Sequence, residues 1–268
     1  MAEAQIETVK TNGFTMDYVR FGQGERTLVI LPGLSVESVT KSADAIAKAY
    51  APLAEHFTIY MFDRRRELPA AYPVVEMAED TAAAFRALGH AQTSLFGASQ
   101  GGMMAIPLAA GHPELVARLI LGSTAARVDE RRYRTFDKWV RLAKDGNAAG
   151  LYQAFGQDVY PRHIYEQSRD YLAQCAKGVT QDELDRFVIL AEGMKGFDVL
   201  DRLRDITCPA LVIGDRDDPV FGEEAAAEIA ERLKDHAGFE LHMYDGYGHA
   251  AYDTAPDYKA RILRWLVA

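Results

Sequence analysis

Short apolar runs alternate with amphipathic stretches along most of the chain. Residues 27–31 (TLVIL) and 57–62 (FTIYMF) are largely apolar, which is typical of strands buried on both faces of a sheet. Residues 74–88 instead repeat apolar positions at helical spacing. The predicted strands are 14–21, 27–31, 57–62, 93–96, 116–121, 210–213 and 239–244, and the predicted helices are 74–88, 102–110, 222–233 and 256–267. This alternation predicts an α/β fold with a doubly wound, mostly parallel sheet.

The interval 127–204 interrupts this alternation, because it contains no convincing buried strand. Helical spacing recurs within it at 133–144, 163–176 and 180–190. We therefore predict a core formed by 1–126 and 205–268, with 127–204 inserted as an α-helical cap or lid. Ligands of parallel sheets bind at the carboxyl ends of the strands, so the cap is expected to cover that edge.

The charge balance narrows the partners that the chain can have. Its 30 Lys and Arg residues and 39 Asp and Glu residues give a net charge of −9, which argues against nucleic acid or an anionic membrane as a partner.

The N-terminus is polar and acidic, unlike a signal peptide, and no apolar run reaches the roughly 20 residues that span a bilayer. Cys175 and Cys208 have no metal-binding spacing and are expected to be free thiols. We therefore expect a cytoplasmic protein with no metal site.

The pentapeptide at 97–101 (GASQG) is the most informative motif, because a predicted strand precedes it and a predicted helix follows it. A serine on such a sharp turn needs small neighbours, since the two backbones approach closely. Its hydroxyl then stands clear of the sheet at the positive end of the helix dipole. Ser99 is therefore the candidate nucleophile, whereas a turn without chemistry is the simpler alternative.

A serine nucleophile needs a base and an acid that orients the base. Of the seven histidines, only His249 lies in a loop directly after a predicted strand at the carboxyl edge, which makes it the candidate base. The strand at 210–213 ends at the same edge in Gly-Asp-Arg-Asp-Asp. Three carboxylates there are candidates for the orienting acid: Asp215, Asp217 and Asp218. The order serine, acid, histidine is the one found on doubly wound sheets.

Over residues 14–266 the chain resembles α/β-hydrolase-fold proteins that carry a helical cap. The resemblance rests on the pentapeptide at 97–101, the acid turn at 214–217 and the Gly-x-Gly-His sequence at 246–249. In the family the acid is the third residue after the glycine of its turn, which implies Asp217, with Asp215 and Asp218 as alternatives. The resemblance also implies an oxyanion hole formed by the backbone N–H groups of Gln100 and Leu34. It implies no cofactor.

Two loops depart from the family pattern. Pro32 stands where many members have histidine, although a backbone donor survives that change. The loop at 63–69 lacks the glycines of the family's Asp-x-Arg-Gly motif. Its Arg64, Arg65 and Arg66 either bind a substrate carboxylate or, as we favour, form structural ion pairs or a solvated turn.

The sequence therefore predicts a serine hydrolase that cleaves a small carboxylic ester, lactone or thioester through Ser99, Asp217 and His249. Its expected partner is a small-molecule acyl substrate, and the oligomeric state stays open. One alternative is a carbon–carbon bond hydrolase, acyltransferase or perhydrolase on the same triad. Another is a non-enzymatic sensor that keeps the fold and binds a small ligand.

Overall fold

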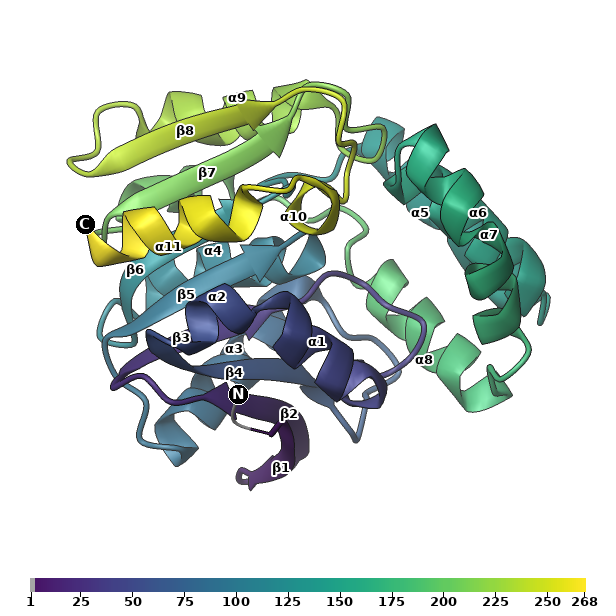
Figure 1. The fold of residues 1–268 in the computed structure, drawn as a ribbon, viewed down its shortest axis with the longest axis horizontal. Coiled ribbons are helices and arrows are strands. Elements are labelled where there is room, and N and C mark those ends of the chain that lie inside the picture. The colour runs from purple at the N-terminus through teal and green to yellow at the C-terminus, as the bar shows by residue number, and fades with distance from the viewer. Residues whose placement is uncertain (1–2) are drawn as a thin grey trace.

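A computed structural model describes residues 3–268 and contains one eight-stranded sheet (Figure 1). The strands are β1 (Gln5–Lys10), β2 (Thr15–Gly22), β3 (Arg26–Leu31), β4 (Phe57–Arg65), β5 (Thr93–Ala98), β6 (Val116–Gly122), β7 (Ala210–Asp215) and β8 (Phe239–Tyr244). Their order in the sheet is β1-β2-β4-β3-β5-β6-β7-β8. The β1–β2 and β2–β4 pairs are antiparallel, whereas all other pairs are parallel. The predicted fold class is confirmed.

Helices cover both faces of this sheet (Figure 1). One face carries α1 (Ala43–Ala49), α2 (Ala51–Ala54), α10 (Ala251–Thr254) and α11 (Tyr258–Val267), and the other carries α3 (Val74–Ala87), α4 (Gln100–Gly111) and α9 (Glu223–Leu233). Strand β3 shows why residues 28–31 are all apolar: Leu28 and Ile30 pack into the first layer, and Val29 and Leu31 into the second. Successive side chains point to opposite faces, and here neither face meets water.

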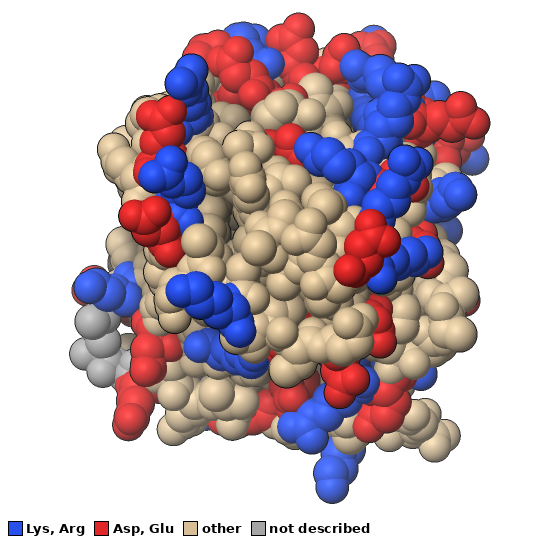
Figure 2. All heavy atoms as spheres, turned by 90° about the vertical axis from the view of Figure 1, so that its right-hand side faces the viewer, with Lys and Arg blue, Asp and Glu red and all other residues tan. Residues whose placement is uncertain are grey.

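A helical insert connects β6 to β7 and lies beyond the carboxyl ends of the strands (Figure 1). It contains α5 (Glu130–Lys144), α6 (Ala148–Val159), α7 (Arg162–Ala176) and α8 (Gln181–Glu192), and the 3-10 helix η2 (Leu200–Asp205) leads back to the sheet. Phe136 and Trp139 of α5 and Phe187 of α8 are buried in the same apolar cluster as Leu31. Seen from the side of the insert, a broad area of uncharged residues fills the middle of the surface, with most charged side chains around it (Figure 2).

Several elements differ from the sequence prediction. Strand β4 continues through Arg65 instead of ending before the charged residues, because Asp63 and Arg64 find buried polar partners. The prediction omitted β1, an edge strand paired only with β2, and α6, whose period is blurred by Gly150 and Gly156. It also omitted the short helices α1 and α2 and the 3-10 turn η1 (Val39–Ser42). Such short elements carry too few apolar positions for a clear period. Among residues 3–268, no helix combines the length and apolarity needed to cross a membrane.

Candidate active site

Ser99 sits on a strained turn between β5 and α4. Its backbone has φ 52° and ψ −121°, a region that residues with a side chain rarely occupy. The flanking glycines permit this turn because the chain passes close to its neighbours. A Cβ on Gly97 would lie 2.5 Å from the carbonyl oxygen of Gly101, and one on Gly101 would lie 1.9 Å from that of Leu31. The pentapeptide therefore adopts the sharp turn that its composition predicted.

We expect Gly101→Ala to destabilise the protein by at least about 2 kcal/mol, because the added methyl overlaps backbone that cannot move freely. The matched control is Gly111→Ala in the same helix, where the nearest atom would be the Arg202 side chain at 3.8 Å. Thermal unfolding of both variants measures the difference. Equal melting temperatures would contradict the close approach at Gly101.

A line of hydrogen bonds joins three buried side chains beside this turn. The Ser99 hydroxyl lies 2.8 Å from Nε2 of His249. On the other side of the ring, Nδ1 of His249 lies 2.9 Å and 3.1 Å from the two carboxylate oxygens of Asp218. The ring of Phe221 meets that of His249 edge-on at 5.3 Å. Ser99 and His249 therefore lie together as predicted, with an acid on the far side of the histidine.

That acid is Asp218 and not Asp217, which corrects the prediction. Strand β7 extends to Asp215, paired with Tyr244 of β8, so the turn begins later than expected. The turn brings the buried carboxylate of Asp218 to His249, and its Oδ1 also accepts the N–H groups of Val220 at 2.8 Å and Phe221 at 3.2 Å. These donors fix the carboxylate and stabilise its charge.

The other two carboxylates tie the loops after β7 and β8 together. Asp217 accepts the backbone N–H of Gly246 at 2.9 Å. Asp215 accepts the N–H groups of Asp217 at 2.8 Å and Tyr247 at 2.9 Å, while desolvation raises its pKa. These bonds hold the loop that carries His249 against the loop that carries Asp218.

Arg64 links the two segments predicted to form the oxyanion hole. Gln100 begins α4, so its N–H lacks a partner within the helix. Leu34 lies in the loop after β3, where Gly33 approaches Ser99: a Cβ on Gly33 would be 3.2 Å from that of Ser99. The Nη2 group of Arg64 donates to the Pro32 carbonyl at 2.8 Å and to Oε1 of Gln100 at 2.9 Å.

The three arginines after Asp63 differ in environment. Arg65 pairs with Asp80 at 3.1 Å and Arg66 with Asp17 at 2.7 Å, so both form the structural ion pairs that the sequence favoured. Arg64 is buried, and desolvation lowers its pKa to about 10, which leaves the guanidinium charged at neutral pH. The link between Arg64 and the site could not be predicted from the sequence. Residues 64–66 are three consecutive arginines, and which of them is buried depends on how far β4 extends.

Helix α8 of the insert is tied to the core beside the same site. The side-chain amide of Gln100 donates to the Leu190 carbonyl at 2.7 Å. Arg186 pairs with Asp63, and Glu183 pairs with Lys41 in the loop region after β3. The insert is therefore anchored to Gln100, whose backbone N–H is a candidate oxyanion donor.

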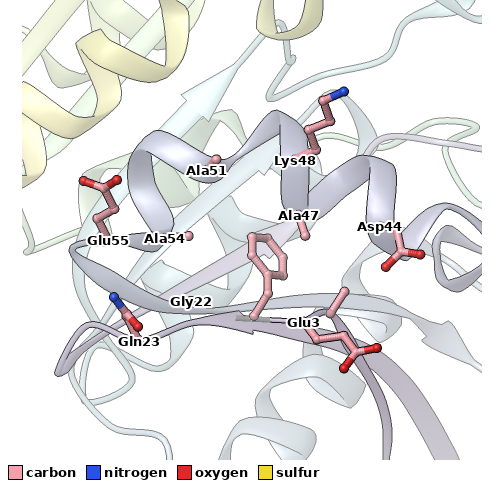
Figure 3. Close-up of a pocket in the computed structure, with 11 residues that line it drawn as sticks. Glu3, Gly22, Gln23, Asp44, Ala47, Lys48, Ala51, Ala54 and Glu55 are labelled. Atoms are coloured by element: carbon pink, nitrogen blue, oxygen red, sulfur yellow. The ribbon is translucent and has the colours of Figure 1, made fainter. Parts of the chain in front are cut away.

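A cavity of about 360 Å³ opens between the loop after β3, the insert and α10. Its walls include Gly33 and Leu34 on one side and Val159, Tyr160 and Tyr252 on the other. Another cavity, of about 530 Å³, lies between β2 and the helices α1 and α2 (Figure 3). Neither Ser99, His249 nor Asp218 lines it. Among residues 3–268, no group of three or more His, Cys, Asp and Glu side chains is arranged to hold a metal ion.

Comparison with known proteins agrees with this architecture. Residues 28–261 match the model of the family described as "Alpha/beta hydrolase family". The chain is 27% identical over 224 residues to the "Putative carbamate hydrolase RutD" of Agrobacterium fabrum, covering 80% of this chain and 85% of that protein. Among solved structures it resembles MGS-M2, an α/β hydrolase enzyme from a deep-sea metagenome library (TM-score 0.85, 22% identity, 98% of each chain). It also resembles the enol-lactonase from Burkholderia xenovorans (TM-score 0.82, 20% identity, 98% of this chain and 100% of that one).

The chain therefore belongs to the α/β hydrolase family and is a hydrolase enzyme. This assignment favours an enzyme over the non-enzymatic sensor considered from the sequence. The family implies small-molecule substrates.

Proposed function

We propose that the protein is a serine hydrolase that cleaves a small carboxylic ester, lactone or thioester. The observation that carries this proposal is the line Ser99–His249–Asp218, with hydrogen bonds of 2.8 and 2.9 Å, at a cavity next to the nucleophile. Each group matches one of the roles that acyl transfer requires: nucleophile, general base and orienting acid.

In the first half-reaction, Nε2 of His249 accepts the hydroxyl proton as Oγ of Ser99 bonds to the substrate carbonyl carbon. The carboxylate of Asp218 accepts the Nδ1–H, which keeps the base in the correct tautomer and stabilises the imidazolium. The backbone N–H groups of Gln100 and Leu34 donate to the oxyanion. The bond to the leaving oxygen or sulfur then breaks, and the imidazolium gives its proton to that atom.

In the second half-reaction, water replaces the leaving group. His249 takes a proton from the water molecule, whose oxygen bonds to the acyl carbon. The bond from that carbon to Oγ of Ser99 breaks, and the proton returns from His249 to the serine. The products are a carboxylic acid and the free enzyme, with no net change in the protein.

Arg64 is proposed to position the oxyanion hole, because one nitrogen holds both segments that contribute donors. We expect Arg64→Met to lower kcat about tenfold to hundredfold with little change in KM, somewhat less than the loss of a whole donor. Arg65→Met is the matched control, since Arg65 pairs with Asp80 away from the nucleophile. Steady-state kinetics on p-nitrophenyl acetate separate kcat from KM. A change confined to KM, or equal losses in both variants, would contradict the positioning role.

Incubation with p-nitrophenyl acetate and with a serine-directed fluorophosphonate tests the proposed reaction. We expect turnover of the ester and one covalent label on Ser99, located by peptide mass spectrometry. Failure of both would overturn the proposal. Cleavage of a vinylogous diketone with simple esters untouched would instead indicate the carbon–carbon hydrolase.

A second candidate is carbamate hydrolysis, because relatives that match 75–91% of the chain are named "Putative carbamate hydrolase RutD". Attack on a carbamate carbonyl uses the same groups. Turnover of a p-nitrophenyl N-alkylcarbamate at a rate comparable to the acetate ester would favour it. A single burst of p-nitrophenol without turnover would favour ester hydrolysis.

A further inference from the structure

The cavity beside Ser99 is bounded by residues that touch the proposed catalytic groups. Gly33 lies against Ser99, and the Tyr252 ring meets the His249 ring edge-on at 6.3 Å. The Val159 carbonyl accepts the N–H of Ala250, the residue after His249. The cavity therefore borders the proposed catalytic groups.

The charged side chains in the cavity wall have one sign. Glu37, from the loop after β3, and Asp253, from α10, are the charged residues among those that line it, and neither Lys nor Arg contributes to the described wall. About half of the Asp253 side chain remains accessible. The other polar contributors include neutral hydroxyls, such as those of Tyr160 and Tyr171, and the thiol of Cys175.

The cations paired with these carboxylates are not among the residues that line the cavity. Lys41 lies 2.8 Å from Glu37 but also pairs with Glu183. Lys259 lies 3.8 Å from Asp253 and donates to the Tyr252 carbonyl. Three carboxylates thus share two ammonium groups, and both of the charged residues that line the cavity are acidic.

We propose that this cavity selects uncharged or positively charged substrates and disfavours anionic ones, with Asp253 and Glu37 as the specificity-determining residues. The inference rests on the serine-hydrolase function proposed above. A substrate carboxylate meets two like charges and no wall cation, and like charges a few ångströms apart repel strongly where the effective dielectric is low. An ammonium group meets two acidic residues in the wall, and a neutral chain packs against Leu34, Phe155 and Leu172.

Matched ester series test this preference in the full-length protein. On the acyl side, p-nitrophenyl hexanoate, mono-p-nitrophenyl adipate and p-nitrophenyl 6-aminohexanoate differ mainly in terminal charge. On the alcohol side, acetylcholine is compared with 3,3-dimethylbutyl acetate, which has the same shape without the charge. In the acyl series we expect kcat/KM to be about tenfold or more lower for the adipate ester than for the hexanoate and 6-aminohexanoate esters. In the alcohol series we expect acetylcholine to be turned over at least as fast as 3,3-dimethylbutyl acetate.

The variants identify the residues responsible. Asp253→Asn is expected to reduce the discrimination at least about threefold, and Glu37→Gln to reduce it further in combination. Asp245→Asn is the control: it removes the same charge from an exposed side chain paired with Arg216 and outside the cavity wall. It should leave the ratio unchanged.

Turnover of p-nitrophenyl acetate, measured beside both series, separates the two proposals. Normal acetate turnover with no charge discrimination in either series would overturn the cavity preference alone. The same holds if discrimination survives Asp253→Asn and Glu37→Gln. If neither acetate turnover nor labelling of Ser99 is detected, the serine-hydrolase proposal fails and the preference with it.

Discussion

Replacing Ser99 with alanine should lower ester turnover on the order of a million-fold, the size of effect seen when the nucleophile of a serine hydrolase is removed. The reason is that Oγ forms the covalent bond to the acyl group, and no other hydroxyl in the described contacts bonds to His249. Fluorophosphonate labelling should disappear in the same variant. The measurement is kcat/KM on p-nitrophenyl acetate, with intact-mass spectrometry for the label.

Ser123→Ala provides the matched control for this loss. Ser123 is also a buried serine with positive φ directly after a parallel strand, and its hydroxyl has no hydrogen-bond partner among the described residues. We expect this variant to retain activity within about threefold. If Ser99→Ala kept its label or its turnover, the nucleophile would lie elsewhere.

The second large effect distinguishes Asp218 from Asp217. Asp218→Asn should reduce kcat about 10⁴-fold, as the equivalent change does in serine proteases. The amide nitrogen of the new side chain would donate to Nδ1 of His249, so that Nε2 would carry the proton and could not accept one from Ser99. The asparagine oxygen can still accept the N–H of Val220, so folding should be little affected.

Asp217→Asn is the control for this prediction, because it makes the same change one residue earlier. Its side-chain oxygen can still accept the N–H of Gly246, and we expect activity within about threefold of the wild type. Stopped-assay kinetics and thermal unfolding should be measured on both variants together. Comparable losses at the two positions would contradict the assignment of the acid to Asp218, and a larger loss at Asp217 would restore the original prediction.

The predictable parts of the fold and site share one property: their signal is local. In the run at 27–31, apolar side chains point to both faces of the sheet, so β3 could be predicted from its own residues. Ser99 and His249 lie in short glycine-containing turns, and the residues next to each turn predict its backbone conformation. Strand β1 and helix α6 escaped prediction because β1 is held by pairing with β2, and α6 by packing against its neighbours in the insert.

The choice among the three aspartates shows where local information ends. All three carboxylates stand within four residues, and counting from Gly214 favours the middle one. Which of them faces His249 depends on the pairing of β7 with β8 up to Asp215, and on bonds from one loop to the other. Those contacts join segments about 30 residues apart, so no pattern within either segment encodes the outcome.

The sequence by itself therefore determined the alternating architecture, the helical insert, the turn at Ser99 and the histidine opposite it, because spacing and backbone freedom act between near neighbours. Only the tertiary structure decided that Asp218 meets His249, that Arg64 is buried between Pro32 and Gln100, and that the cavity wall carries Glu37 and Asp253. These features depend on how distant segments pack. Packing fixes which side of a strand, turn or helix each charged group faces.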